Sequence, residues 1–111
     1  MILNDFTRFE VYHNTEKNHN KVWGHFHHGG TVWTFWGGVG KAWSFKYHGL
    51  VEHGPLHNYT GIQAHISQLA LTKRDKGYVL IDQPQLDVID ATWRDRFNER
   101  FVWFLLQTTT D

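Results

Sequence analysis

Nine histidines and no cysteine make imidazole the main potential metal ligand in this chain of 111 residues. His25, His27 and His28 are close in sequence, and His25 and His27 would share one face of a strand, as two ligands of a metal site can. The sequence has no His-Glu-x-x-His or Cys/His finger spacing to supply further ligands. Four other histidines could join only through the tertiary fold: His48, His53, His57 and His65. We therefore expect surface histidines or core hydrogen bonds, with no metal ion and no cofactor.

A catalytic site would need a nucleophile, a base and an orienting group in one pocket. The only serines are Ser44 and Ser67, and neither lies in the Gly-x-Ser-x-Gly context of a nucleophile elbow. The glycines of residues 37–40 lack the Gly-Lys-Ser/Thr ending of a phosphate-binding loop. In the last third of the chain the acidic residues interleave with arginines, which is typical of a solvated helix face. We therefore predict that this chain is not an enzyme.

Aromatic and basic side chains of the types that bind nucleic acids are also present. Aromatic faces stack on bases or sugars, while basic groups hold phosphates. The candidate binding residues are Trp36, Lys41, Lys46, Lys73, Arg74 and Lys76. Trp36 could equally be a core aromatic. Lys73, Arg74 and Lys76 could instead stabilise the negative end of a helix dipole, a role that is compatible with binding phosphate.

These candidates need a scaffold, and its centre is the segment of residues 31–47. Residues 31–36 are rich in Thr, Val, Trp and Phe, which favours a strand. From residue 41 on, aromatic residues alternate with small or polar ones, which indicates a second strand. The glycines of residues 37–40 permit positive φ, so the chain can reverse tightly between the two strands. The sequence predicts a β-hairpin with Trp36 beside its turn.

The segments before and after this hairpin complete an α+β fold. Residues 6–13 and 21–27 alternate as strands do, so four strands in series predict an antiparallel meander. Residues 49–58 read as a loop. A helix over residues 60–76 follows, with capping-box spacing at Thr60 and Gln63 and a left-handed cap at Gly77. Its apolar stripe should pack on the sheet: Ile62, Ile66, Leu69 and Ala70. Residues 78–82 predict a short fifth strand. We predict a four- to five-stranded antiparallel sheet with one helix packed on a face.

The end of the chain predicts a second helix over residues 87–107, with Asp87 or Asp90 as its N-cap. Residues 101–106 are apolar on every side of a helix, so they should be buried in the fold or against a partner. Trp103 and Phe104 are the candidate partner contacts. We expect a homodimer through this helix, or its tight docking on the first part, with Trp103 buried in either case. Residues 1–111 are expected to form one domain.

Two motifs resemble the WGR domain family. Trp36-Gly-Gly-Val-Gly40 is similar to the family's Trp-Gly-Arg-(Val/Ile)-Gly at a strand end. Lys73-Arg-Asp-Lys-Gly-Tyr78 is similar to its second signature, a basic helix end closing in Lys-Gly-Tyr. The resemblance covers residues 6–82, and it departs from the family at Gly38, which stands where the name-giving arginine should be.

The resemblance implies a DNA-binding, non-catalytic role. In poly(ADP-ribose) polymerases the WGR domain packs against the end of a broken DNA strand, where its tryptophan contacts the terminal nucleotide and its arginine supports backbone and interdomain contacts. Applied to the matching residues of this chain, the resemblance implies that Trp36 contacts nucleic acid and that Gly38 does not. The alternative is a protein-interaction module, such as a small regulator or inhibitor of a nucleic-acid enzyme of the mobile-element or phage type.

Charge and hydropathy bear weakly on these alternatives. Residues 1–78 contain eight basic and five acidic residues, for a net +3, whereas residues 79–111 contain three and six, for a net −3. A mildly basic first part favours an anionic partner, and it is also compatible with ordinary solvated faces. The absence of cysteine and of a signal-peptide pattern suits a cytoplasmic location, and no apolar run has membrane-spanning length.

Overall fold

The computed structural model describes residues 6–49 and 58–109. Its strands are β1 (Phe6–Asn14), β2 (Lys21–His28), β3 (Thr31–Gly38), β4 (Ser44–His48) and β5 (Val79–Ile81), and its helices are the 3-10 turn η2 (Glu16–Asn18), α1 (Tyr59–Asp75), α2 (Gln83–Ile89) and α3 (Trp93–Thr109). The strands form one antiparallel sheet in the order β4-β3-β2-β1-β5. The α+β class and the antiparallel sheet predicted from the sequence are confirmed.

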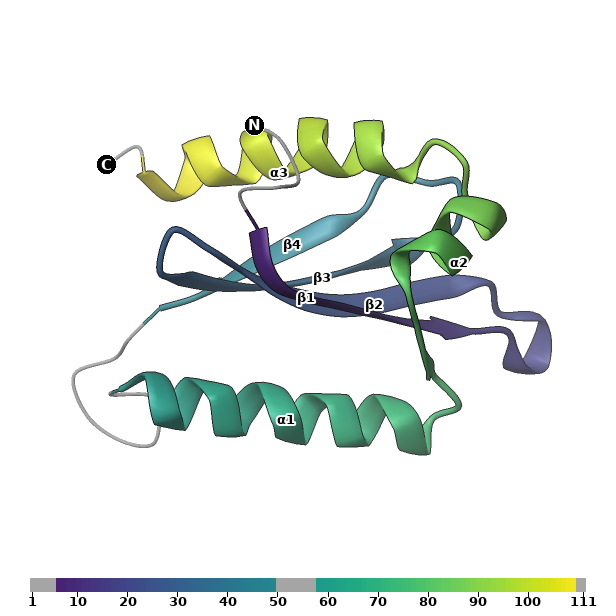
Figure 1. Ribbon diagram of the computed structural model, residues 1–111, viewed down its shortest axis with the longest axis horizontal. Coiled ribbons are helices and arrows are strands. Elements are labelled where there is room, and N and C mark those ends of the chain that lie inside the picture. The colour runs from purple at the N-terminus through teal and green to yellow at the C-terminus, as the bar shows by residue number, and fades with distance from the viewer. Residues whose placement is uncertain (1–5, 50–57, 110–111) are drawn as a thin grey trace.

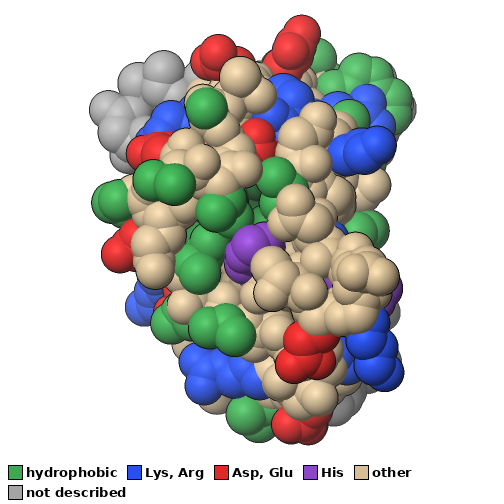
Figure 2. Space-filling view, turned by 90° about the vertical axis from the view of Figure 1, so that its right-hand side faces the viewer, with side chains coloured by type: hydrophobic (Ala, Val, Ile, Leu, Met, Phe, Trp, Pro, Cys, Tyr) green, Lys and Arg blue, Asp and Glu red, His purple; other side chains and the backbone are tan. Residues whose placement is uncertain are grey.

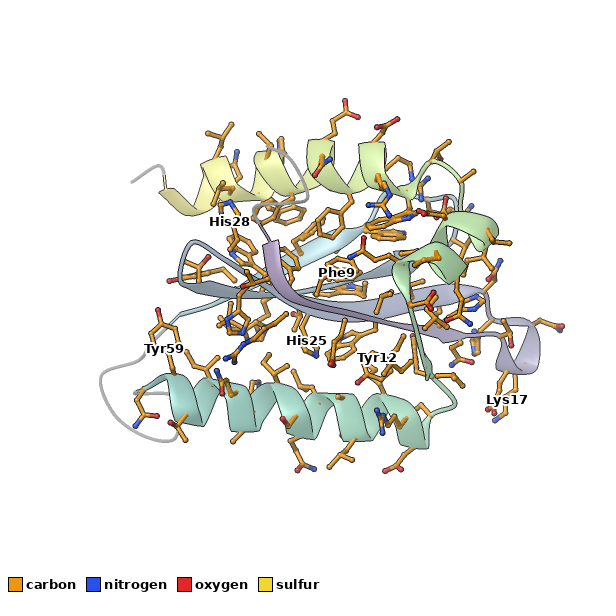
Figure 3. The ribbon with its side chains drawn as sticks, in the orientation of Figure 1. Phe9, Tyr12, Lys17, His25, His28 and Tyr59 are labelled. Atoms are coloured by element: carbon orange, nitrogen blue, oxygen red, sulfur yellow. The ribbon has the colours of Figure 1, made fainter. Side chains whose placement is uncertain are left out.

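The sheet lies between two helices. Figure 1 shows α3 along one face and α1 along the other, with α2 beside the joint that leads into α3. Alternation along the strands divides the side chains between these faces: Phe9 points toward α3, while Tyr12 and His25 point toward α1 (Figure 3). Only one packed helix and an additional C-terminal helix were expected, so the second covered face is a finding of the structure.

The core between α3 and the sheet is mostly aromatic. Phe97, in the middle of α3, lies with ring centroids 5.0 Å from Phe45, 5.2 Å from Phe35 and 5.3 Å from Phe26. All four side chains are buried in one cluster, with ring edges meeting ring faces. Gly24 of β2 has no side chain, and a Cβ there would overlap the Phe35 ring. This packing fixes α3 on the sheet.

The predicted stripe of α1 packs on the other face. Ile62, Ile66 and Ala70 are its buried residues. They contribute to two small clusters, one with Val32 and one with Trp23. These clusters are smaller than the core under α3, and polar side chains occupy part of the remaining face. The two faces of the sheet therefore differ in character.

The predicted ends of α1 are partly wrong. Asn58, not Thr60, is the N-cap, and its side chain accepts a hydrogen bond from the Gly61 backbone N–H at 2.8 Å. An asparagine oxygen caps as well as a threonine hydroxyl does, and the cap lies two residues earlier than predicted. At the other end Gly77 adopts φ 99°, which confirms the left-handed cap. The predicted loop that carries His53 and His57 lies outside the described residues.

The single helix predicted over residues 87–107 is wrong. The chain forms two helices there, α2 and α3, separated at Asp90, whose φ and ψ of −149° and 80° are not helical. The N-cap of α2 is Asp82, which forms a complete capping box with Gln85. Asp90 instead uses its carboxylate to accept hydrogen bonds from Gly40, in the turn after β3, and from Arg96 of α3. Such tertiary contacts are invisible to helical periodicity.

None of the helices in the described parts of the chain is long and apolar enough to cross a membrane.

Candidate nucleic-acid interface

Trp36 is one of two exposed tryptophans among the six in the chain. Its relative exposure is 41% and that of Trp103 is 49%, whereas the other four are buried. Trp36 lies opposite Trp23 of β2 and Ser44 of β4, which places it on the α1 face of the sheet. Trp23 packs with Ala70 of α1, but Trp36 lies one strand farther from β1 and remains accessible. An indole in this position can stack on a ligand.

The turn after Trp36 depends on its glycines. An ideal Cβ at Gly37 would lie 2.5 Å from Cδ1 of Trp43, so the Trp43 ring occupies the space of the missing side chain. Trp43 donates its indole N–H to the Gly38 carbonyl oxygen at 2.9 Å. Gly40 adopts φ 77°, which costs glycine little. These contacts hold the strand end that presents Trp36.

The joint between α2 and α3 also holds this turn. Asp90 accepts a hydrogen bond from the Gly40 N–H at 2.9 Å and two from Arg96, at 2.9 and 2.6 Å. Arg96 in addition donates its Nε–H to the Lys41 carbonyl oxygen at 3.0 Å. Burial alone would raise the pKa of Asp90, but the hydrogen bonds from Arg96 and Gly40 hold it below the usual value. The carboxylate is therefore charged and fixes the turn.

Lys41 and Lys46 both lie near the strand end that carries Trp36. Lys46 of β4 is opposite Thr34, so it shares the α1 face with Trp36 as a diagonal neighbour. The stem of Lys41 lies against Gly38, where an ideal Cβ would be 3.0 Å from Lys41 Cγ. Both lysines are exposed. Two exposed positive charges therefore lie near the indole.

A groove between the β1–β2 hairpin and the end of α1 collects more positive charge. Its volume is about 370 Å³. Five of its lining residues are basic or imidazole side chains: Lys17, His19, Lys21, Lys73 and Lys76. Glu16 and Asp75 also line it, so the charge is positive but mixed. Figure 2 views this end of the molecule, where Lys and Arg side chains lie among Asp and Glu rather than in one continuous patch.

Lys73 is affected by burial and by the other positive charges of this groove. Burial, and then the neighbouring charges of Lys76 and Lys21, lower the pKa of its ammonium group. The Lys73 Nζ lies 5.4 Å from the centroid of the Tyr78 ring, which favours a nearby cation. An anion bound in the groove would relieve the repulsion between these lysines.

Asn14 joins the two walls of the groove. Its side-chain amide donates to the Lys76 carbonyl oxygen at 3.2 Å, and its amide oxygen accepts from the Glu16 backbone N–H at 2.8 Å. The Asn14 side chain is buried. Lys21, on the opposite side of this hairpin, pairs with Gly38 of β3. One wall of the groove therefore lies next to the end of the strand that carries Trp36.

The candidate residues fall into two groups: Trp36, Lys41 and Lys46 lie on β3, the turn after it and β4, whereas Lys73 and Lys76 lie in the groove without Arg74. Lys73 and Lys76 line the groove, whereas the guanidinium of Arg74 lies 5.5 Å from the ring centroid of Tyr12, in a different cleft. Lys17 and Lys21 were missed by the sequence analysis. Their polar, basic loop is visible in the sequence, but only the pairing of β5 with β1 brings the end of α1 beside it.

The three clustered histidines do not converge. His25 and His27 share the α1 face, but His28 lies on the α3 side, with its ring centroid 5.2 Å from that of Phe101. His25 Nε2 is 3.1 Å from Glu10 Oε1. Within residues 6–49 and 58–109, no three His, Cys, Asp or Glu side chains are grouped as metal ligands.

The candidate partner residues at the end of α3 differ from each other. Phe104 is partly buried against the core, with its ring centroid 5.7 Å from that of Phe45. Trp103 is 49% exposed, with the guanidinium of Arg100 5.0 Å from its ring centroid. The expectation that docking of this helix buries Trp103 is wrong, because the docked face of α3 is the one that carries Trp93, Phe97 and Phe101.

Comparison of this chain with protein-family models, with curated proteins and with solved structures finds no match in any of the three.

Proposed function

We propose that this chain is a non-catalytic module that binds nucleic acid, with a preference for strand ends. The observation that carries the proposal is the exposed indole of Trp36 at a strand end. Lys46 lies diagonal to it on the same face, and Lys21 lies opposite Gly38, two residues further along β3. An exposed ring stacks on a terminal base or sugar, and lysines around it hold the adjoining phosphates.

The resemblance to the WGR family supports the same assignment. In that family the tryptophan of the motif meets the terminal nucleotide, and Trp36 is the corresponding residue here. Gly38 provides no arginine, but the Lys41 side chain lies directly against it. We propose that Lys41 supplies part of the positive charge that the family places at this position.

The proposal is tested by fluorescence anisotropy with matched duplexes that differ only in their ends: recessed, blunt and closed by hairpins. Trp36→Ala should weaken binding to recessed or 5′-phosphorylated ends by about tenfold, since stacking contributes roughly 1–3 kcal/mol per base. The closed duplex should lose less, because it exposes no terminal nucleotide. Trp103→Ala is the matched control, since it removes the other exposed indole. Absence of binding to any duplex or single strand at low salt would contradict the proposal.

Restoring the family residue gives a second, independent test. An arginine at position 38 requires only that the flexible Lys41 stem shift, because that stem is the nearest obstacle to a Cβ there. Gly38→Arg should therefore fold normally and increase affinity for recessed ends, whereas Gly38→Gln should not. If arginine and glutamine have the same effect, position 38 of this chain does not correspond to the family's arginine.

A protein-interaction module is the second candidate function. The exposed apolar side chains of the last helices favour it: Trp103, Leu106 and Val88 are all exposed. Under this alternative Trp103→Glu would abolish capture of a protein partner while leaving nucleic-acid binding unchanged. The partner would be a nucleic-acid enzyme that this chain regulates or inhibits. Comparing Trp36→Ala with Trp103→Glu in a pull-down, with and without nuclease, distinguishes the two functions.

A further inference from the structure

Part of the sheet face on the α1 side is polar, beside the small apolar clusters that α1 covers. On the α3 side, β1 and β2 present apolar residues to the core. On the α1 side they present Arg8, Glu10, His25 and His27. A helix normally packs on an apolar sheet face, so polar residues between a helix and a sheet call for an explanation other than packing. None of these four residues belongs to the proposed nucleic-acid interface.

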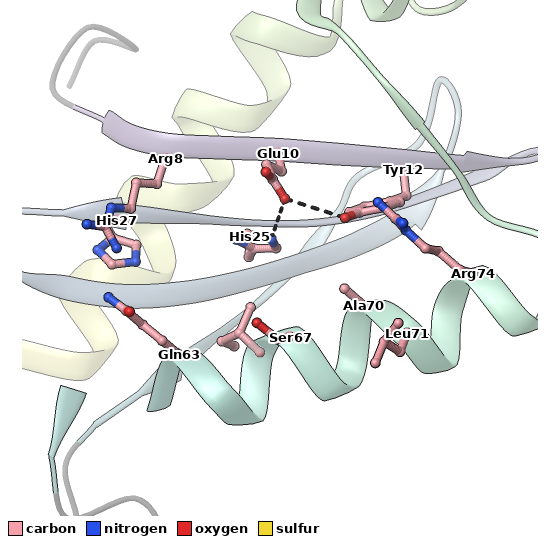
Figure 4. A pocket seen from close by; sticks show the side chains of 11 residues that line it. Arg8, Glu10, Tyr12, His25, His27, Gln63, Ser67, Ala70, Leu71 and Arg74 are labelled. Atoms are coloured by element: carbon pink, nitrogen blue, oxygen red, sulfur yellow. Dashed lines mark hydrogen bonds and ion pairs between the residues drawn. The ribbon is translucent and has the colours of Figure 1, made fainter. Parts of the chain in front are cut away.

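These residues line a cleft of about 440 Å³ between α1 and strands β1 and β2 (Figure 4). The helix contributes small residues, Ser67 and Ala70, at its centre, which leaves space between it and the sheet. Ile66 and Leu71 make the helix wall apolar, and Leu71 is 54% exposed. A volume of this size fits a small molecule, and apolar walls with a few polar groups are typical of ligand sites.

Two arginines stand at opposite ends of this cleft (Figure 4). Arg8 occupies a β-bulge between Thr7 and Glu10, in a left-handed conformation with φ 53° that is unusual for a residue with a side chain. Arg74 extends from α1 over the Tyr12 ring. In the described parts of the chain neither guanidinium is in an ion pair, and both arginines are exposed, so both can reach a ligand in the cleft.

The one carboxylate of the cleft is already engaged. Glu10 Oε1 is 3.1 Å from His25 Nε2 and accepts a hydrogen bond from the Tyr12 hydroxyl at 3.4 Å. Burial lowers the pKa of His25, and burial and the charge of Arg8 lower that of His27, so both rings are neutral at pH 7. The net charge of the cleft is therefore positive, and it comes from the two arginines.

We propose that this cleft binds a small organic anion, an oxyanion carried on a planar ring. Arg8, His27 and Gln63 lie together at one end and offer donors to the oxyanion (Figure 4). The ring lies along Ile66 and Leu71, where the Arg74 guanidinium stacks on its face. Free phosphate lacks the ring that would contact Arg74, and a neutral aromatic molecule lacks the charge that would contact Arg8. Neither can therefore make the contacts at both ends of the cleft.

The experiment titrates the whole chain with phenyl phosphate, inorganic phosphate and phenol, each followed by amide chemical shifts. Phenyl phosphate should bind at least about tenfold more tightly than either fragment, because only it uses both ends of the cleft. Arg8→Gln and Arg74→Gln should each weaken its binding by about tenfold, the effect of losing one charged hydrogen bond. Arg94→Gln is the control and should leave this binding unchanged, since Arg94 lies on α3, on the other face of the sheet, in an ion pair with Asp87.

Ser67→Leu provides a variant that spares both arginines. It fills the cleft from an exposed helix position and should abolish phenyl phosphate binding with the fold intact, as circular dichroism would show. Equal affinity for phenyl phosphate and its fragments, or equal losses in Arg94→Gln and Arg8→Gln, would overturn the proposal. Because these variants lie outside the Trp36 surface, failure here is separable from failure of the nucleic-acid proposal.

Discussion

At the scale of single residues, Trp36 and Gly38 carry the functional argument, and they differ in how far the sequence could define them. The Trp-Gly-Gly-Val-Gly motif singled out Trp36, but its periodicity was equally compatible with a core role. Its exposure follows from the position of α1, which covers Trp23 on the neighbouring strand and stops short of Trp36. Gly40 needed no structure to be recognised as a turn residue. Gly37 lies inside β3, and only the structure shows that the Trp43 ring fills the space beside it.

His48 is a residue whose environment predicts a dependence of stability on pH. It is buried in a 2.8 Å hydrogen bond with Thr34, and burial, then Lys46 and His65, lower its pKa to about 4. The unfolded chain has the ordinary pKa of about 6.5, so it binds the proton more readily. The contribution of His48 to the free energy of unfolding should therefore be fully present above pH 6.5. It should be lost as the pH drops toward 4, by roughly 2–3 kcal/mol at most.

Urea denaturation at pH 7.5, 5.5 and 4.5 measures this loss. His48→Gln keeps a hydrogen-bonding side chain beside Thr34 but cannot be protonated, so its stability should fall less over the same interval. His25 and His27 also have lowered pKa values and contribute a loss of the same sign in both proteins. If both proteins lose stability equally, His48 is not the group responsible.

At the scale of secondary-structure elements, the sequence predicted every strand and the helix α1, because strand alternation and the helical stripe are local patterns. It failed at the end of the chain, where the break at Asp90 is made by contacts with Gly40 and Arg96. The sequence also predicted the same binding role for Lys73 and Arg74, since adjacent basic residues at a helix end cannot be told apart by type or position. The side chains leave the helix about 100° apart, and the sheet beneath sends them to different clefts.

The Asp90 contacts predict that the α2–α3 joint stabilises the turn that presents Trp36. Asp90→Ala leaves the Gly40 N–H and the Arg96 guanidinium without their acceptor. Removing one partner of a buried ion pair costs about 3–5 kcal/mol, and the partial exposure of Arg96 places this case at about 3 kcal/mol or below. Chemical denaturation gives the change in unfolding free energy. The control is Asp95→Ala, at an exposed position of α3, which should change the unfolding free energy by less than about 0.5 kcal/mol.

The docking of α3 predicts opposite outcomes for two of its aromatic residues. Phe97→Ala removes a fully buried ring and should lower the free energy of unfolding by about 3–5 kcal/mol. Trp103→Ala removes a half-exposed ring and should cost about 1 kcal/mol or less in the monomer. Denaturation at two protein concentrations, with light scattering, makes the comparison. A large and concentration-dependent loss in Trp103→Ala would show that Trp103 is buried in a homodimer.

At the scale of the whole molecule, positive and negative side chains are mixed rather than gathered in one field. The chain has no formal net charge, and the basic groove contains Glu16 and Asp75 among its lysines. Nucleic-acid binding should therefore be weak and sensitive to salt. If two or three lysines contact phosphates, the slope of log affinity against log salt on duplex DNA should be about −2 to −3.

Anisotropy at several salt concentrations gives this slope. Lys73→Gln and Lys76→Gln should each flatten it by about 0.9, with similar losses for all duplex ends, because phosphate contacts carry no end preference. Arg74→Gln serves as the control, since Arg74 lies in the other cleft. If the slope is unchanged by both lysine variants but reduced by Arg74→Gln, the phosphates bind in the cleft of Arg74 and not in the basic groove, which contradicts the prediction.

The central claim, that Trp36 meets the nucleic acid, is tested most directly by the indole N–H signals of the six tryptophans in a nuclear magnetic resonance titration. Trp36→Phe and Trp103→Phe assign the two exposed indoles. On addition of a short duplex with a recessed end at low salt, the Trp36 signal should shift or broaden with the binding curve, while the Trp103 signal stays in place. Movement of Trp103 alone, or of neither indole while binding occurs, would contradict the account.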